Sequence, residues 1–180
     1  VHGVIEARPT EFGYWMGMTS YEAIGWNIEL ALADETVSMI VLDIASPGGM
    51  VYGAMELAEK IYKARSTKPI VAVANPMAAS GAYWIGAAAT RIVSTPSGDV
   101  GSVGVIGEHH DESKALEQEG VKVTYVLSTN SPYKGESGLP LTDEARANMQ
   151  SRADSIYGQF VGDLARFRGV TTDLVIEKYG

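Results

Sequence analysis

Apolar residues occur in short runs along this 180-residue chain, and glycine, proline or polar residues bound most of the runs. A short apolar run between such breaks predicts a strand, and an almost continuous run predicts a strand buried on both faces of a sheet. The predicted strands are Val1–Ile5, Val37–Ile44, Ile70–Ala74, Arg91–Thr95, Val103–Ile106 and Val121–Leu127.

Between these runs, apolar residues recur three or four positions apart, which predicts amphipathic helices. The predicted helices are Ser20–Ala33, Val51–Arg65, Tyr83–Ala89, Asp111–Glu119, Thr142–Arg168 and Thr171–Tyr179, where Ser20 and Thr142 are N-caps. Three connecting segments are rich in glycine or polar residues and are predicted to be irregular: Glu6–Thr19, Ser97–Ser102 and Ser128–Leu141.

Strands and helices alternate along the whole chain, and each crossover is long enough to join parallel strands. The sequence therefore predicts an α/β fold of repeated β-β-α or β-α units. We expect residues 1–180 to form a single domain, with a helical C-terminal part at about 142–180.

Composition narrows the classes of function. The net charge of −8 argues against binding of nucleic acid or an anionic membrane surface. The absence of cysteine excludes disulfides and thiol chemistry. No apolar run is long enough for a membrane-spanning helix, and no signal peptide is recognisable, so no direct membrane contact is expected of this sequence. The sequence begins at Val1, which is consistent with a processed product.

Ser80 stands where a predicted strand passes into a predicted helix, among the small residues Ala78, Ala79, Gly81 and Ala82. A serine at this junction is most often only a helix cap. The alternative is a nucleophile, because helix-terminal N–H groups beside the hydroxyl can hold an oxyanion. The flanking alanines exclude the Gly-x-Ser-x-Gly pattern of the α/β-hydrolases.

A second strand-to-helix turn, Ser46-Pro-Gly-Gly49, precedes Ser80 by one predicted strand. On adjacent parallel strands, both turns would lie at the same end of the sheet. A substrate carbonyl between them would meet the N–H of Gly49, the N–H of Gly81 and the hydroxyl of Ser80. An ordinary turn that needs glycine torsions remains the alternative.

These segments resemble the signal peptide peptidase A family of serine peptidases. The resemblance rests on Leu42–Gly49, Lys68–Val73, Ala79–Tyr83 and Gly101–Gly104, in that order and spacing. Three further fragments resemble the phage branch of the family, the capsid assembly proteases: Ala33-Asp34, Ser113–Glu117 and Leu141–Glu144.

The resemblance implies a ClpP/crotonase-type fold and a Ser/Lys dyad. It implies that Ser80 is the nucleophile, that Gly49 and Gly81 donate the oxyanion N–H groups, and that Lys134 is the base. Ser102 matches a serine that helps to orient the lysine. A lysine base must be neutral, and burial against Pro132 and Tyr133 would lower its pKa, whereas a nearby Glu136 would oppose that change.

Three alternatives remain open. His109, in His109-His-Asp111, is a rival base, and a metal site there is disfavoured because neighbouring strand positions face opposite ways. A crotonase-like acyl-thioester enzyme would share the oxyanion geometry, but its carboxylates and nucleotide groove are not evident. A non-catalytic scaffold or assembly subunit would keep only the fold.

For the partners, we expect a polypeptide substrate, no cofactor, no metal and no nucleic acid. The resemblance implies a homo-oligomeric ring and, for the phage branch, capsid or scaffold proteins as substrates in the bacterial cytoplasm or the phage prohead. The cellular branch would instead degrade leftover signal peptides at a membrane, through an anchor outside this sequence.

Overall fold

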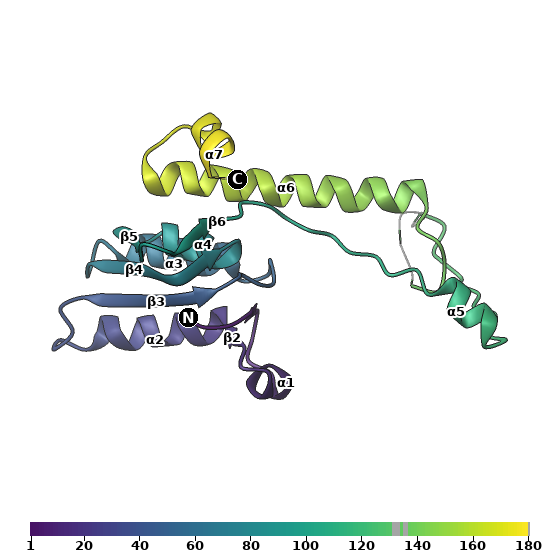
Figure 1. The fold of residues 1–180 in the computed structure, drawn as a ribbon, viewed down its shortest axis with the longest axis horizontal. Helices are drawn as coiled ribbons and strands as arrows, with labels where there is room; N and C mark the ends of the chain where they lie inside the picture. The colour runs from purple at the N-terminus through teal and green to yellow at the C-terminus, as the bar shows by residue number, and fades with distance from the viewer. Residues whose placement is uncertain (131–133, 135–136, 180) are drawn as a thin grey trace. The chain divides into compact units, whose positions relative to one another are not determined.

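The computed structural model describes residues 1–130, 134 and 137–179, and these form two compact units. The first unit comprises Val1–Gly104 and Gln159–Gly180, and the second comprises Val105–Gly158. The elements of both are labelled in Figure 1. The single-domain assignment of residues 1–180 remains a prediction, and each unit is described by itself below.

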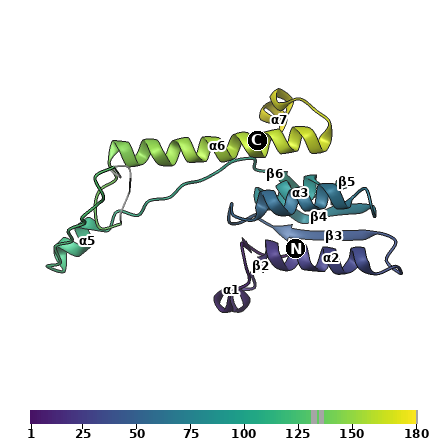
Figure 2. The ribbon, with the colours of Figure 1, turned by 180° about the vertical axis from the view of Figure 1, so that it is seen from behind.

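A parallel sheet forms the centre of the first unit. Its order is β3-β4-β5, and β6 also pairs with β4. In Figures 1 and 2 the labels β3, β4 and β5 follow one another across the sheet from either side. The strands are β3 Ile40–Ser46, β4 Ile70–Ala79, β5 Arg91–Ser94 and β6 Asp99–Gly101. Parallel pairing confirms the α/β class that the alternation of elements predicts.

Three helices of the first unit begin close to their predicted positions: α2 Tyr21–Ala33, α3 Ala54–Ala64 and α4 Gly81–Ala87. Ser20 caps α2 as predicted, because its hydroxyl accepts a hydrogen bond from the N–H of Ala23 at 3.1 Å. Helix α3 packs against both α2 and α4. All seven residues of α4 are buried, so this helix is part of the core.

Strand β4 passes through Asn75-Pro76, where the sequence predicted its end, and this boundary was wrong. The register explains the difference. Ala74 pairs with Ile44, whereas Ala78 pairs with Ser46, so β4 carries extra residues there against β3. Proline is tolerated in a sheet at such bulges because its missing N–H is not needed for the ladder.

The N-terminal segment is more ordered than predicted. Strands β1 Ile5–Glu6 and β2 Thr19–Ser20 pair in parallel, and a short helix α1, Glu11–Trp15, lies between them in the sequence. The loop prediction for Glu6–Thr19 was wrong over this helix. Thr10 caps α1 by accepting from the N–H of Gly13 at 2.9 Å, and Glu11 follows in the first turn.

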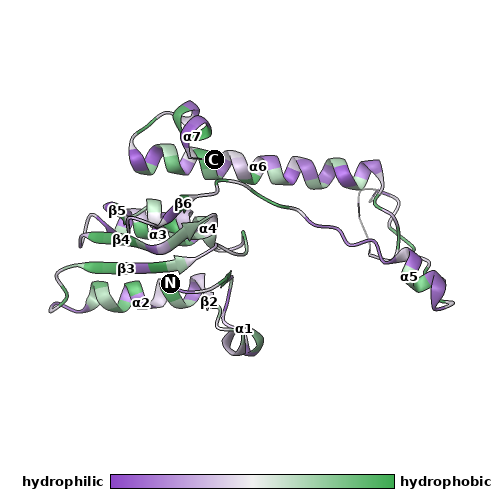
Figure 3. Cartoon of the chain, in the orientation of Figure 1, coloured by the Kyte–Doolittle hydropathy of each residue, from purple (hydrophilic) through white to green (hydrophobic). Residues whose placement is uncertain are grey.

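The last two helices are α6 Asp143–Arg168, which Thr142 caps as predicted, and α7 Thr172–Lys178, which Thr171 caps. Figure 3 shows α6 as largely hydrophilic, in contrast to β3. Its part in the first unit contributes the buried apolar residues Phe160, Leu164 and Phe167. Phe160 stacks on Trp84 of α4 with ring centroids 4.3 Å apart, so this segment belongs to the core.

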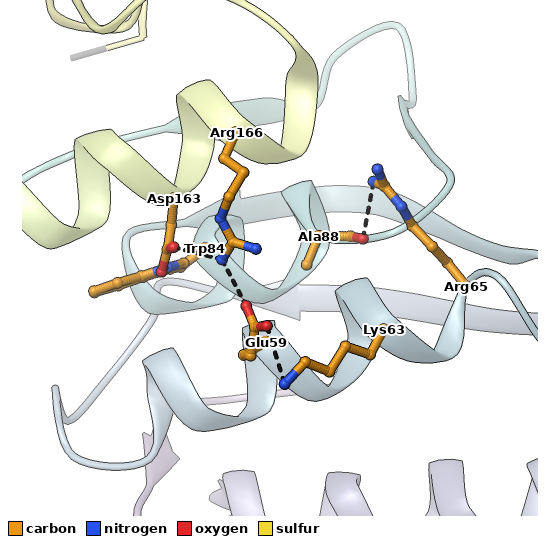
Figure 4. A network of polar contacts seen from close by, with 7 residues as sticks. All are labelled: Glu59, Lys63, Arg65, Trp84, Ala88, Asp163 and Arg166. Carbon is orange, nitrogen blue, oxygen red and sulfur yellow. Dashed lines mark hydrogen bonds and ion pairs between the residues drawn. The ribbon is translucent and has the colours of Figure 1, made fainter.

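A polar network joins α6 to α3 and α4 at the edge of that core (Figure 4). Arg166 donates to Glu59 at 2.6 Å and to Asp163 at 2.8 Å. The indole N–H of Trp84 donates to the other oxygen of Asp163 at 3.0 Å. The hydrogen bond from Arg166 is the main reason that the pKa of Glu59 lies below its ordinary value.

The second unit contains α5 Ser113–Gln118 and the first part of α6, and its described residues carry no strand. The predicted strand Val121–Leu127 was therefore wrong. The predicted strand Val103–Ile106 was also wrong, because the chain instead pairs with β4 slightly earlier, through β6. The predicted irregular turn Ser97–Ser102 was therefore wrong over Asp99–Gly101, which forms β6.

Candidate functional site

Ser80 joins β4 to α4 and has an unusual backbone. Its φ is 51° and its ψ −126°, a conformation that residues with a side chain rarely adopt. Strained residues of this kind persist where the surrounding structure fixes them, and they concentrate at functional sites. The strain supports a hypothesis of function for Ser80.

The hydroxyl of Ser80 is not used to cap α4. Ser80 occupies the N-cap position, but its side chain makes no capping hydrogen bond. By contrast, the side chains of Thr10, Ser20 and Thr171 cap the helices that follow them. Ser80 is half-buried, so its hydroxyl remains available to react. The simplest structural explanation for a serine at this junction, helix capping, does not apply.

The two predicted turns meet at one end of the sheet, since β3 and β4 are neighbouring parallel strands. Gly48 lies against Ser80; it belongs to the predicted turn, but no separate role was predicted for it. A Cβ on Gly48 would lie 2.8 Å from the Cβ of Ser80 and 2.9 Å from the backbone N of Gly81. Gly48 also has a φ of +99°, so both its backbone and its surroundings require glycine.

Neighbouring residues fix the turn that carries Gly48. The buried Ser46 accepts the N–H of Gly48 through its hydroxyl at 3.1 Å. The N–H of Ile5 donates to the carbonyl of Gly48 at 2.9 Å, and the N–H of Met50 donates to the carbonyl of Ile5 at 2.8 Å. Strand β1 therefore holds one side of the turn.

The N–H groups of Gly49 and Gly81 form no hydrogen bond with any of the residues that the structure describes. The Cβ position of Gly81 lies 3.8 Å from the N of Gly49, so the two glycines are close neighbours. Both predicted oxyanion donors are thus unpaired and adjacent to Ser80.

Strand β6 supports Ser80 from the other side. The N–H of Ser80 donates to the carbonyl of Gly101 at 2.8 Å, next to the pairing of Ala79 with Gly101. Ser102 follows directly and also has a positive φ, 55°. The structure therefore brings the backbone beside Ser102 to Ser80, and the orienting role of Ser102 remains a prediction.

Tyr21, the first residue of α2, also reaches this junction, and the sequence analysis did not identify it. Its side chain is buried, and a Cβ on Gly81 would collide with its hydroxyl oxygen. Burial raises the pKa of Tyr21 well above its usual value, so the phenol is neutral. A helical residue gives no local signal of such a contact, because the contact depends on how α2 packs.

The predicted bases lie in the second unit. Lys134 is exposed there, and its pairing with Ser80 remains a prediction. Pro132, Tyr133 and Glu136, which were expected to tune the lysine, lie outside the described residues.

The rival base, His109, contacts the carbonyl of Leu139 through Nε2 at 3.2 Å. It lines a cavity of ≈ 620 Å³ within the second unit, together with Asp111 and Arg146. Hydrogen bonds from Ser113 keep the pKa of Asp111 below its ordinary value.

The described residues offer neither a metal-binding cluster nor a membrane-spanning helix. They contain no group of three or more His, Cys, Asp or Glu side chains arranged to hold a metal ion. None of the helices that they form is both long and apolar enough to cross a bilayer.

Comparisons with known proteins agree with the sequence resemblance. The family model described as Peptidase family S49 matches residues 62–177. The capsid assembly protease C of Escherichia phage lambda is 33% identical over 98% of this chain and 40% of its own length. A putative signal peptide peptidase SppA of Enterococcus faecium is 32% identical over 80% of this chain and 42% of its own length.

This chain therefore spans about two fifths of the length of these curated relatives. Among solved structures, a ClpP1 mutant from Listeria monocytogenes aligns with 99% of this chain and 76% of its own at 13% identity, with a TM-score of 0.47.

Proposed function

Because this chain belongs to peptidase family S49, we propose that it is the catalytic part of a serine endopeptidase, with Ser80 as nucleophile. The observation that carries the proposal is the hydroxyl of Ser80. It stands on a strained turn, makes no capping bond, and lies beside two backbone N–H groups that are unpaired among the described residues. The family supplies the class of reaction, and these atoms supply its chemistry.

The reaction begins when a base removes the proton of the Ser80 hydroxyl. The oxygen then bonds to the carbonyl carbon of a peptide, and the oxyanion that forms accepts hydrogen bonds from the N–H groups of Gly49 and Gly81. Each such donor is worth about 3 kcal/mol in peptidases where one has been removed. The C–N bond breaks, the base returns the proton to the amine, and water later hydrolyses the acyl ester.

For the base we propose Lys134, in a Ser/Lys dyad. A lysine accepts a proton only when neutral, and its ordinary pKa of about 10.4 leaves it charged near pH 7. Closure of the site around Lys134 must therefore exclude water from its amine. Ser102 is the proposed orienting residue, because it follows the carbonyl that holds the N–H of Ser80.

The proposed biological setting is the maturation of a phage capsid or scaffold. The phage relative aligns with 98% of this chain, whereas the signal peptide peptidase relative aligns with 80%. The substrates would then be capsid or scaffold polypeptides, and the catalytic subunits would form a ring in the prohead.

The test is covalent labelling with a fluorophosphonate probe, read by intact mass and peptide mapping. The wild type and His109→Ala should be labelled at Ser80, whereas Ser80→Ala and Lys134→Ala should not. Lys134→Arg is the matched control for charge, because arginine keeps the cation but cannot act as the base.

Each other outcome contradicts a stated part of the proposal. Labelling that depends on His109 would replace the Ser/Lys dyad with a histidine base. A wild type that never reacts, even as the assembled oligomer, would favour a non-catalytic scaffold subunit.

A further inference from the structure

Tyr21 carries a buried hydroxyl with no hydrogen-bond partner. The residue is 3% exposed, and its hydroxyl oxygen forms no hydrogen bond with any of the described residues. Buried tyrosine hydroxyls usually have a partner, and each exception calls for an explanation. The oxygen points at the junction that holds Ser80, since it lies where Gly81 lacks a Cβ.

Two glycines fit against the side chain of Tyr21 at its two ends. A Cβ on Gly53 would lie 3.2 Å from the Cβ of Tyr21 and 3.1 Å from Cδ2 of its ring. A Cβ on Gly81 would overlap the hydroxyl oxygen, yet would lie 3.5 Å from Cζ, at ordinary contact distance. The oxygen atom alone therefore occupies the space of a side chain at position 81.

We propose that Tyr21 is a positioning residue for the oxyanion site. Its hydroxyl packs against Gly81 and fixes the plane of the Ser80–Gly81 peptide, whose N–H is one of the two proposed donors. The other donor, the N of Gly49, adjoins the same point. This inference rests on the proposed function, because it concerns the hydrogen bonds that Ser80 chemistry requires.

An unpartnered hydroxyl lowers the stability of the folded state, because it loses its hydrogen bonds to water on burial. A purely structural tyrosine would gain stability if this oxygen were removed. The presence of the oxygen is explained if its volume keeps the Ser80–Gly81 peptide in place. Tyr21→Phe should therefore separate stability from reactivity.

The first experiment compares Tyr21→Phe with the wild type. We expect the melting temperature to be equal or higher, and the maximal rate of Ser80 labelling at saturating fluorophosphonate to fall about tenfold, since a small displacement of a donor has a large effect. The half-saturating probe concentration should change less than about twofold.

Tyr83→Phe is the matched control for the first experiment. Tyr83 is also buried, lies on α4 and contacts Tyr179 edge-on. It should keep labelling within about twofold of the wild type. Unchanged labelling of Tyr21→Phe would overturn the proposal. So would a rate that falls only in step with a lower melting temperature, because loss of folded protein would then account for the whole effect.

The second experiment removes the hydroxyl oxygen at position 21 and adds a methyl group at position 81. Gly81→Ala alone should lower the melting temperature, because its methyl collides with the Tyr21 hydroxyl. The double variant Tyr21→Phe/Gly81→Ala should recover most of that loss, since the methyl then takes the place of the oxygen. A double variant no more stable than Gly81→Ala would refute the packing on which the proposal rests.

The two experiments also separate this inference from the proposed function. The melting temperatures of the single and double variants can be measured without any peptidase activity. They therefore test the contact of Tyr21 with Gly81 by itself. A wild type that is not labelled at Ser80 refutes the proposed function and the positioning role together. A labelled wild type with no effect of Tyr21→Phe refutes the positioning role alone.

Discussion

At the scale of single residues, the candidate site is marked by polar groups without hydrogen bonds and by glycines at positions too crowded for a Cβ. Among the residues that the structure describes, Ser80 makes no cap bond and the Tyr21 hydroxyl has no partner. Gly48 and Gly81 have no Cβ where neighbouring atoms lie. The strained backbone of Ser80 and the buried hydroxyl of Tyr21 are both unfavourable for stability. They support the proposed site at this junction.

The variant Gly48→Ala tests whether the turn beside Ser80 requires glycine. The methyl would lie 2.8 Å from both the Cβ of Ser80 and the carbonyl oxygen of Ala79, and the φ of +99° adds strain of roughly 1–2 kcal/mol. We expect a lower melting temperature by differential scanning fluorimetry and loss of Ser80 labelling. Gly104→Ala is the control, because nothing lies within 4 Å of its Cβ position. Equal behaviour of the two variants would show that the turn does not require glycine.

At the scale of elements, α6 is anchored to α3 and α4 by a stacked aromatic pair and an ion-pair network. Trp84 takes part in both, through its ring with Phe160 and its N–H with Asp163. Because α4 begins immediately after Ser80, this packing fixes the helix that carries the proposed donor Gly81. The anchoring therefore links α6 to the site.

The Glu59–Arg166 pair predicts a pH dependence of stability. Hydrogen bonding to Arg166, ahead of the other causes, lowers the folded-state pKa of Glu59 below 4.5. A lowered carboxyl pKa gives stability that is fully present above the unfolded value and is lost as the pH falls through the folded value. Glu59→Gln should therefore lower the melting temperature at pH 7 but much less at pH 3.

The expected effect is modest, at most about 1 kcal/mol, because the side chains are partly exposed. Glu56→Gln on the same helix serves as the control, since Glu56 is exposed and has no ion pair among the described residues. Parallel melting curves for the Glu59→Gln variant and the wild type from pH 3 to pH 7 would contradict the prediction.

At the scale of the whole molecule, the family assignment confirms the resemblance drawn from the sequence, while the catalytic roles of individual residues remain proposals. The two bases under consideration belong to the second unit and the nucleophile to the first.

At this scale we predict that the chain forms a homo-oligomer. Analytical ultracentrifugation should give a mass several times the 19.2 kDa of one chain. Labelling of Ser80 should decrease on dilution below the dissociation concentration, because the assembled site would be lost. A monomer that is labelled at full rate would show that a single chain contains the complete site.

The sequence by itself determined the alternation of strands and helices, the caps at Ser20 and Thr142, the two turns and the family. These features depend on local periodicity, on side chains that bond to nearby backbone, and on glycine torsions, all of which short segments encode. The α/β class followed from them, and the parallel sheet confirmed it.

Only the tertiary structure decided how these parts meet. It carried β4 through Asn75-Pro76 by a bulge against β3, and it paired β6 with β4 in place of the later strand predicted at Val103–Ile106. It also placed the Tyr21 hydroxyl against Gly81. Each of these joins residues that are distant in the chain, and their contact energies outweigh the local preferences from which the sequence predictions were made.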